Sequence, residues 1–441
     1  MKVAYKHILE NLEAKPSIED VSRCLYQLGH EHEIDNKIIN IEITPNRGDC
    51  LSLNGILRDL SVFYERCSNS HPIFEDKIEE LNIDFENFSK NSCPKISFLE
   101  LQIEKVPDEY SGVLDDYFSE LKANKINFFT DISNYISYEM GQPTHCYDAK
   151  KINNKIIFKE IKESKMFQTL HEKSIKLLDK NAVFIQNNEI INLAGVMGGK
   201  STSCSKNTKS VIIECAFFNP ESIIGKSIKY DLQSDAAYKF ERGVDFNCQE
   251  SVLRRFIKLV SDHTLIRSMS YKAFEYERKL ENKLSLDVNI INKIIGSDIS
   301  HSQYVKHLTK LGFVIDKQLI SIPTFRNDIT SQNDLAEEIA RVIGYDNLPV
   351  KEINIPKKSL INNKFEKKVK GFLLDNGFYE VINSPFVEKY SKHSIKVDNP
   401  LDSNKTYLRN NLTDSLLSNL LFNERRQKDS IKLFEISDIY S

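Results

Sequence analysis

The sequence lacks any pair of cysteines in a C-x-x-C spacing, although eight cysteines occur among its 441 residues. Such pairs are the usual signature of structural zinc sites, so no zinc site is predicted. No apolar run approaches the roughly 20 residues needed to cross a bilayer, and the opening stretch, MKVAYKHILENLEAK, is too polar for a secretory signal. These absences lead us to expect a soluble protein with free cysteines in a reducing cytoplasm.

An excess of positive charge is also lacking, because the formal net charge is −3. A broad basic field of the kind that binds nucleic acid is therefore excluded, and any RNA contact must be local. One basic stretch does occur between Lys357 and Lys370, and a solvated linker followed by a helix face is the simplest interpretation of it. We expect neither a membrane nor DNA as a partner.

The order of polar and apolar residues predicts a multidomain α+β fold. The length suggests about three domains, and the expected elements fall into four segments, 1–69, 70–268, 269–352 and 353–441. The first is predicted to be a small helical and extended module, and the second a mixed or antiparallel sheet region. The third is a small helix–strand module, and the fourth contains the beginning of a further domain.

Individual elements follow from the spacing of apolar residues. Apolar positions three and four apart predict helices at 17–29, 250–263, 303–313 and 334–344. Runs of apolar and β-branched residues between polar turns predict strands at 38–45, 155–161, 181–186, 189–199 and 210–218. Either Asp49 or Ser52 is expected to cap the helix that follows the first of these strands.

Four carboxylates lie close together in the stretch FRNDITSQNDLAEEIARVIGYDNLP. Residues three and four apart share a helix face, so Asp334, Glu337 and Glu338 can converge, and Asp328 can fold back onto them. Carboxylate oxygens without cysteine or histidine suit a hard cation such as Mg²⁺. Asp334 and Glu337 also fit a capping box at a helix N-terminus, and spacing alone favours that explanation.

A second set of polar residues is spread over the 70–268 segment. Its members are Ser133, Asn134, His145, Gly195, Gly198, Gly199, Glu214, Ser234, Asp235, Ala236, Glu241 and Arg242. Glu214 stands in an otherwise apolar strand, where it must either point to solvent or face a polar pocket. A lone histidine such as His145 is more often structural than catalytic, and the paired glycines could make a hairpin or bulge. No Ser-His-Asp or Cys-His order indicates a nucleophilic triad.

Together these blocks resemble the β subunits of bacterial-type phenylalanine–tRNA ligases, and they occur in the family's order. The matching stretches are IEITPNRGDCLSLNGILRDL, DISNYISYEMGQPTHCYD, LAGVMGG, ECAFFNP, SDAAYKFERGVD, FRNDITSQNDLAEEIARVIGYDNLP and NPLDSNKTYLRNNLTDSLL. The resemblance implies an α subunit as partner in an α₂β₂ assembly, with ATP, phenylalanine and the ligation chemistry on the α subunit. It also implies tRNA-Phe as a substrate, and a final domain that is part of a class II synthetase-like fold without the chemistry.

The resemblance assigns roles to both sets of residues. It places a magnesium site, shared with the α subunit, on Asp328, Asp334, Glu337 and Glu338, and so reverses the preference for a simple cap. It places an editing site, which hydrolyses tyrosine mistakenly attached to tRNA-Phe, in the 70–268 segment. Within that site, Glu214 binds the tyrosine hydroxyl and Ala236 leaves room for the ring. The positions around the ester and the attacking water are Ser133, Asn134, His145, Gly195 and Ser234.

The sequence departs from the family pattern in several places. Serine replaces the usual threonine at Ser133 and Ser234, and Asn124 stands where the family commonly has an arginine. Compared with long forms of the family, we expect this chain to lack the OB-fold tRNA-binding insert near Ile43 and the C-terminal anticodon-binding domain. Two alternatives therefore stay open: a free-standing hydrolase that edits Tyr-tRNA, and a structural subunit whose editing site has decayed.

Overall fold

A computed structural model describes the whole chain except residues 68–70, 153–154, 179, 278–281, 351–363 and 389–392. The chain divides into two compact units, Met1–Lys351 and Glu352–Ser441. The sequence placed a boundary between 352 and 353, one residue away. The first part of the basic stretch around Lys357 lies outside the described residues, and its second part belongs to a helix.

The N-terminal module combines a small antiparallel sheet with three helices. Its strands have the order β1-β3-β2, and the elements are β1 (Lys2–Ala4), α1 (Tyr5–Glu10), α2 (Ile18–Gln27), β2 (Glu31–Asp35), β3 (Ile38–Glu42) and α3 (Leu53–Leu60). The helix predicted over 17–29 is α2, which buries Val21 and Leu25. The predicted strand at 38–45 is β3.

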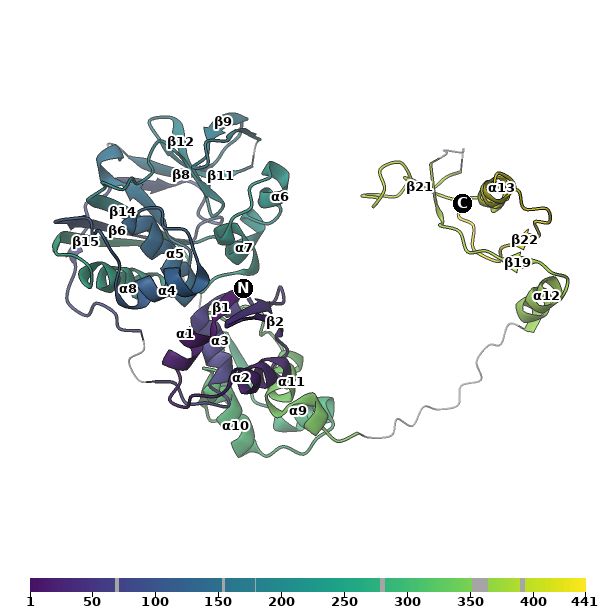
Figure 1. Cartoon of the computed structure of the whole chain (residues 1–441), viewed down its shortest axis with the longest axis horizontal. Helices are drawn as coiled ribbons and strands as arrows, with labels where there is room; N and C mark the ends of the chain where they lie inside the picture. The colour runs from purple at the N-terminus through teal and green to yellow at the C-terminus, as the bar shows by residue number, and fades with distance from the viewer. Residues whose placement is uncertain (68–70, 153–154, 179, 278–281, 351–363, 389–392) are drawn as a thin grey trace. The chain divides into compact units, whose positions relative to one another are not determined.

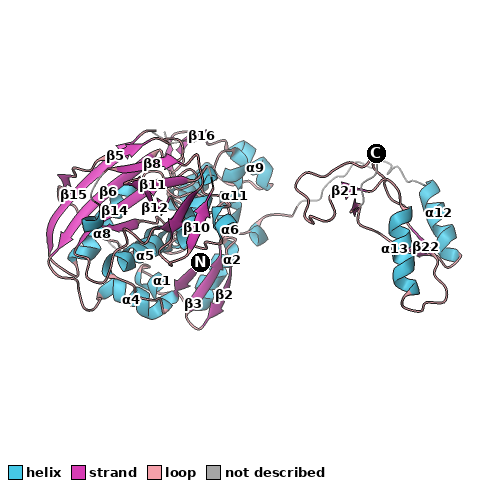
Figure 2. Cartoon of the chain, turned by 90° about the horizontal axis from the view of Figure 1, so that it is seen from above, coloured by secondary structure: helices cyan, strands magenta, loops and turns pink. Residues whose placement is uncertain are grey.

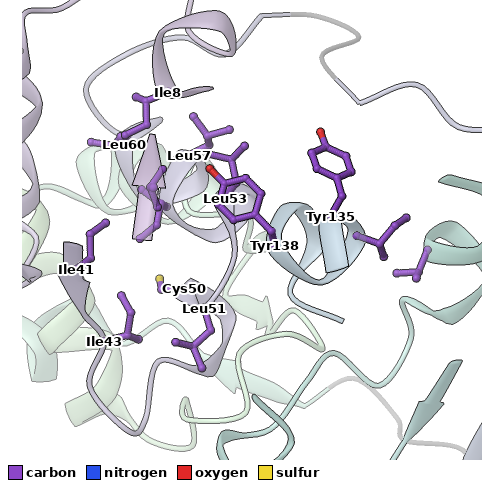
Figure 3. Packing of buried hydrophobic residues seen from close by; sticks show 14 of the residues in the cluster. Ile8, Ile41, Ile43, Cys50, Leu51, Leu53, Leu57, Leu60, Tyr135 and Tyr138 are labelled. Carbon is purple, nitrogen blue, oxygen red and sulfur yellow. The ribbon is translucent and has the colours of Figure 1, made fainter. Parts of the chain in front are cut away.

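Helix α3 begins at one of the two caps that the sequence offered. Ser52 is the N-cap, because its Oγ accepts a hydrogen bond from the backbone nitrogen of Gly55 at 2.9 Å. The apolar face of α3 is buried in a core that also contains Tyr135 and Tyr138 of a helix from the next segment (Figure 3). The N-terminal module and the second segment thus share one hydrophobic core.

The second segment is built on a five-stranded sheet with the order β4-β15-β6-β14-β7. Its strands are β4 (Glu79–Glu80), β6 (Lys95–Ile103), β7 (His145–Asp148), β14 (Ser210–Phe217) and β15 (Ile266–Glu275). Strand β14 pairs antiparallel with β6 on one edge and with β7 on the other. Alternate residues of a strand point to opposite faces of a sheet, so this sheet presents two distinct faces.

One face of this sheet is covered by helices and the other by a second sheet (Figure 1). The helices are α4 (Gly112–Leu121), α5 (Phe128–Met140) and α8 (Gln249–Ser261). The second sheet has the order β13-β12-β11-β8-β5, with β5 (Phe85–Asn87), β8 (Ile156–Glu160), β11 (Ala182–Gln186), β12 (Glu189–Leu193) and β13 (Met197–Gly198). Within this second sheet, the rings of Phe158 and Phe184 pack in a tilted arrangement, with ring centroids 5.0 Å apart.

Smaller elements complete the segment. They are a hairpin of β9 (Lys165–Gln168) and β10 (Ser174–Leu177), and the helices α6 (Lys226–Tyr230) and α7 (Asp235–Arg242). The predicted strand at 189–199 is interrupted, because a turn at Gly195 (φ +66°) separates β12 from β13. The hairpin therefore turns at Gly195, and the Gly198–Gly199 pair lies at its far strand.

The third segment packs three helices on a small antiparallel sheet of order β16-β18-β17. Its elements are β16 (Lys283–Ser285), α9 (Val288–Ile295), α10 (His301–Lys310), β17 (Val314–Asp316), β18 (Leu319–Ser321) and α11 (Gln332–Ile343). The predicted boundary at 268 is displaced, because β15 continues to Glu275 and pairs with β6 along its length. Strand β6 itself was not predicted.

A network of buried ion pairs joins this third segment to the N-terminal module. Asp59 accepts hydrogen bonds from Arg47, from His30 Nε2 at 2.8 Å and from Arg341 Nη1 at 2.7 Å. Arg341 also donates to Glu338 at 2.6 Å. Every one of these side chains is at least nine-tenths buried. Removing one member of such a network leaves an uncompensated charge in the interior.

The described residues of the second unit form helices and short strand pairs (Figure 2). Its elements are α12 (Lys364–Asp375), β19 (Tyr379–Glu380), β20 (Phe386–Val387), β21 (Tyr407–Leu408), α13 (Thr413–Glu424) and β22 (Leu433–Phe434). Among its described residues only Arg409 and Phe434 are buried. Across both units, no helix in the described part of the chain combines the length and apolarity needed to span a membrane.

The ion-pair network gives a first testable prediction. Arg341→Met should lower the free energy of unfolding of the Met1–Lys351 unit by about 3–5 kcal/mol, because Asp59 and Glu338 each lose a buried cation. Urea unfolding followed by circular dichroism measures the change. Lys105→Met, which breaks an exposed pair with Asp108, should cost less than about 1 kcal/mol. Equal losses in the two variants would show that the buried network contributes no special stability.

Candidate functional site

The site is centred on Glu214, whose side chain lies between the two sheets. Along β14, Val211, Ile213 and Cys215 face the helices, so Ile212 and Glu214 face the second sheet. Glu214 as a whole is only 4% exposed. The sequence left open whether Glu214 points to solvent or into a polar pocket, and the structure buries it beside polar side chains of both sheets.

Two donors reach the same oxygen of Glu214. The hydroxyl of Tyr147 on β7 donates to Oε2 at 2.5 Å, and the amide of Asn192 on β12 donates to it at 3.2 Å. Burial raises the pKa of Glu214 to about 7, although these two hydrogen bonds act to lower it. Burial therefore favours the protonated form of this carboxyl group more than water does.

His145 lies directly opposite Glu214 in the register of β7 and β14. Burial lowers the pKa of His145 to about 4, so the imidazole is neutral at physiological pH. Its ring stands edge-on to Tyr147, with centroids 4.5 Å apart. Among the described residues, its Nε2 atom is buried without a hydrogen-bond partner. A neutral imidazole in this state can accept a hydrogen bond from a ligand or a water molecule.

Gly198 allows the second sheet to approach this histidine. A Cβ atom added to Gly198 would lie 3.0 Å from Nε2 of His145 and closer still to Cε1. Asn192 pairs with Gly198 across the β12–β13 hairpin. A side chain at position 198 would therefore push the imidazole away from the pocket or separate the two sheets.

Ser133 and Asn134 on α5 have different surroundings. The hydroxyl of Ser133 donates to the backbone oxygen of Thr144, 2.8 Å away, and lies 2.7 Å from that residue's Oγ1. Because Thr144 precedes His145, this contact ties α5 to the start of β7. Asn134, the next residue on the helix, is exposed. Ser133 thus supports the position of the histidine, whereas Asn134 faces outward.

Ser234 and Ala236 lie at the start of α7. The hydroxyl of Ser234 caps this helix by accepting from the backbone nitrogen of Ala237, and it donates to the backbone oxygen of Val196 at 2.7 Å. Ala236 is half-buried against the core between the sheets. The Val196 contact fixes the start of α7 beside the Gly195 turn.

Gly195 is restricted by conformation and by space. Its φ of +66° lies in the left-handed region that favours glycine. An added Cβ would also lie 2.8 Å from Cδ1 of Ile223 and 3.2 Å from the ring of Phe240. The turn can therefore carry only glycine without rearrangement of the core.

A lysine that the sequence did not single out joins α7 to α5. Lys239 donates to the backbone oxygen of Ser137 and to its Oγ, the latter at 3.0 Å. Burial lowers the pKa of Lys239 to about 8. Ala236 precedes Lys239 by three residues and so lies on the face of α7 that meets α5. This contact brings α5 and α7 to the same end of the pocket.

The four carboxylates of the predicted magnesium site are not gathered around one point in the isolated chain. The guanidinium of Arg326 donates to both oxygens of Asp328 at 2.8 Å, and to both oxygens of Glu338 at 2.7 and 2.8 Å. Glu337 is exposed. A cation at Asp328 and Glu338 would have to displace this arginine, so the set does not fit a metal ion in this arrangement.

Asp334, the fourth member of that set, belongs to a helix cap. Ser331 is the N-cap of α11, and Oδ2 of Asp334 accepts from the backbone nitrogens of Thr330 and Ser331, both at 2.8 Å. The sequence placed this capping box one turn later, with Asp334 and Glu337 as its members. The box exists, with Ser331 and Asp334 as its members. Magnesium binding stays a prediction from the sequence.

Another cluster has the composition of a metal site. His30, Cys50 and Asp59 have ligand atoms within 4.8 Å of one another. Arg47 donates to Cys50 at 2.8 Å and to Asp59 at 3.0 Å, and Arg341 also donates to Asp59. The negative charge is already compensated by these two guanidinium groups, so the cluster does not fit a cation.

Tyr147 and Asn192 are the site residues that the sequence reasoning missed. Both lie inside motifs that were examined, THCYD and IINLAG. Tyr147 follows His145 by two residues, so alternation along a strand places it on the same face. Asn192 is the polar residue of an apolar strand, which is the same signal that identified Glu214.

The raised pKa of Glu214 predicts a pH dependence of stability. Between the ordinary pKa of 4.5 and the folded value of about 7, the folded chain keeps a proton that the unfolded chain releases. Stability should therefore fall by up to about 3 kcal/mol as the pH rises through this interval, and stay low above it. Glu214→Gln should flatten this fall when urea unfolding is compared at pH 5 and pH 8.

The matched control for this experiment is Glu189→Gln. Glu189 is exposed at the start of β12, so its replacement should leave the pH dependence of the parent unchanged. If Glu214→Gln and the parent lose the same stability between the two pH values, Glu214 does not hold its proton in the folded state.

Comparison with known families gives three matches along the chain. The B3/4 domain model matches residues 105–264, which contain all the residues around Glu214 described above. The tRNA synthetase B5 domain model matches residues 284–345. The model of the phenylalanyl tRNA synthetase beta chain CLM domain matches residues 347–441.

Relatives extend the match over most of the chain. The phenylalanine–tRNA ligase beta subunit of Psychrobacter arcticus is 30% identical over 91% of this chain, and that of Fusobacterium nucleatum is 31% identical over 92%. The chain spans about half the length of these curated relatives, 53% in both cases. An N-terminal fragment of the phenylalanyl-tRNA synthetase beta subunit from Pyrococcus horikoshii covers 78% of the chain at 12% identity with a TM-score of 0.42. The three domain matches and the sequence relatives show that the chain belongs to the family of phenylalanine–tRNA ligase β subunits.

Proposed function

We propose that the chain serves as the β subunit of a phenylalanine–tRNA ligase and hydrolyses tyrosine wrongly attached to tRNA-Phe at the Glu214 site. The observation that carries the proposal is the hydrogen bond from the Tyr147 phenol to buried Glu214 at 2.5 Å. It demonstrates that this carboxylate accepts a phenol hydroxyl inside the protein. A tyrosine side chain in the pocket would present the same chemical group.

A second site of this kind solves a specificity problem. A pocket shaped for phenylalanine rejects an analogue with one extra hydroxyl only weakly, by about 10²-fold in a comparable case. A buried carboxylate reverses the preference, because phenylalanine would leave its oxygen unpaired whereas tyrosine would bond it. Glu214 therefore supports selection for tyrosine at the hydrolytic step.

The surrounding residues support hydrolysis by water. His145 is neutral and its Nε2 has no partner among the described residues, so it can accept a hydrogen bond from the attacking water. We assign Ser234 and Asn134 to the ester and the tRNA end, and Ala236 to the space for the ring. The proposed reaction needs no covalent intermediate, because the described residues around Glu214 include no activated nucleophile.

The second unit supports an assembly with another polypeptide. Its described residues bury almost no core, and their exposed apolar side chains include Phe365, Phe372, Tyr379, Ile382, Leu401 and Phe422. A unit of this size without a core requires further surface to be stable. We propose an α subunit as the partner, in an α₂β₂ assembly in which the α subunit joins phenylalanine to tRNA-Phe with ATP.

A free-standing hydrolase is the second candidate, because every residue of the proposed editing site lies within the Met1–Lys351 unit. That unit has its own core and could present the pocket without a partner. Assembly and hydrolysis therefore need separate experiments.

Co-expression with the cognate α subunit tests the assembly. We expect the two chains to co-purify and the complex to charge tRNA-Phe with phenylalanine, because the second unit gains the surface it lacks. Size-exclusion chromatography and an aminoacylation assay measure both results. Hydrolysis of Tyr-tRNA by the chain alone, without co-purification of the α subunit, would favour the free-standing hydrolase.

Ala236→Met tests the editing pocket. The longer side chain should fill the space proposed for the tyrosine ring and slow hydrolysis of Tyr-tRNA-Phe at least about tenfold, whereas phenylalanylation by the complex should not change. Ala123→Met, at a half-buried position after α4, is the matched control. Unchanged hydrolysis in Ala236→Met would place the ring elsewhere, and no hydrolysis by the parent would favour a structural subunit with a decayed site.

A further inference from the structure

Three polar groups meet at a single oxygen of Glu214. Tyr147 donates to Oε2 at 2.5 Å, and the amide nitrogen of Asn192 lies 3.2 Å from Oε2 and 3.0 Å from the Tyr147 hydroxyl. An amide nitrogen can only donate. When Glu214 is ionised, its oxygens can only accept, so the single proton of Tyr147 points to Glu214 while the Tyr147 oxygen accepts from Asn192. In that state the directions of all three hydrogen bonds are fixed.

The two donors are rigid parts of the fold. Tyr147 is fully buried and Asn192 is 3% exposed. Tyr147 belongs to β7 in the first sheet and Asn192 to β12 in the second, so their contact crosses the interface between the sheets. Tyr147 could leave Glu214 only if this interface opened. It is therefore not a mobile plug that competes with a ligand for the carboxylate.

The other oxygen of Glu214 differs sharply from the first. Among the described residues, no hydrogen bond reaches Oε1, although the residue as a whole is 4% exposed. Nε2 of His145, on the residue opposite in the register, also has no partner. Buried polar groups are normally paired, so the unpaired Nε2 of His145, on the strand that pairs with that of Glu214, marks a place for a polar group of a ligand.

We infer that Tyr147 and Asn192 act as positioning residues that hold Oε2 of Glu214, so that Oε1 is the atom that recognises the phenol hydroxyl of the substrate. This inference rests on the proposed function and specifies which atoms of its site select the substrate. A carboxylate held on one side cannot rotate to hide its free oxygen. A ligand without a hydroxyl then leaves Oε1 unpaired, and is rejected.

The test is Tyr147→Phe in the full chain assembled with its α subunit. Hydrolysis of tRNA-Phe charged with tyrosine should show a KM about tenfold higher, because the recognising oxygen loses its fixed orientation, and a kcat within about twofold. Slow hydrolysis of tRNA-Phe charged with phenylalanine should not change. Asn192→Leu should shift the tyrosine KM in the same direction.

Tyr135→Phe is the matched control, since it removes another buried phenol, one that donates to Glu139 at 2.8 Å. It should leave the ratio of tyrosine to phenylalanine hydrolysis as in the parent. The inference is overturned if Tyr147→Phe leaves this ratio unchanged, or if it slows both esters equally, which is the result of a purely structural role.

A binding measurement separates this inference from the proposed function. Calorimetric titration with tyrosinamide and phenylalaninamide should show a preference for the phenol in the parent, reduced about tenfold in Tyr147→Phe. If the parent prefers tyrosinamide but hydrolyses no Tyr-tRNA, the proposed function fails and the inference stands. If the parent hydrolyses Tyr-tRNA and the variant keeps the full preference, the inference alone fails.

Discussion

The pairing of β14 on both edges, with both of its faces covered, is the constraint on which the rest of the site depends. A strand in that position directs each side chain toward one of the two layers that cover it. Glu214 is therefore forced into the interior, and the interior must supply its partners. The Tyr147 and Asn192 hydrogen bonds, the raised pKa and the free oxygen all follow from that single position. The other residues of the site lie on the strands and helices that pack around Glu214.

The polar groups around Glu214 lie between two sheets that otherwise pack through aromatic and aliphatic side chains. Small residues allow the two sheets to approach closely at this point. Gly198 lets the hairpin lie against His145, and Gly195 lets the chain turn back beside the start of α7. Neither glycine has a functional side chain. Each one determines how closely the polar side chains of neighbouring elements can approach one another. The proposed editing site thus depends on the path of the backbone at these glycines as much as on acidic and basic side chains.

Local patterns in the sequence predicted much of this arrangement. The periodicity of α2, α8 and α11 was sufficient to place those helices, and Glu214 stood out because its neighbours are apolar. Strand β6 escaped prediction because Ser97 and Glu100 break its apolar run, and its burial comes from pairing with β14 and β15, which are distant in sequence. Tertiary context overrides local preference in such strands.

The carboxylates near α11 show a different limit of sequence reasoning. Their spacing predicted that all four could converge, but only Asp328 and Glu338 meet in the structure, and spacing does not tell which cation they meet. In the isolated chain that cation is Arg326, a residue two positions from Asp328. A resemblance to a family can assign a metal to such a cluster, whereas the geometry records only the partners that this chain itself supplies.

The contact between Asp59 and Arg341 spans 282 residues of sequence, which has a consequence for the order of events during synthesis. A ribosome adds about 5–20 residues each second, so roughly 15–60 s separate the appearance of the two side chains. Throughout that interval Asp59 has Arg47 of its own module as a partner but lacks Arg341, which has not yet been synthesised. The module that is made first can therefore reach its final packing only after most of the chain has been translated.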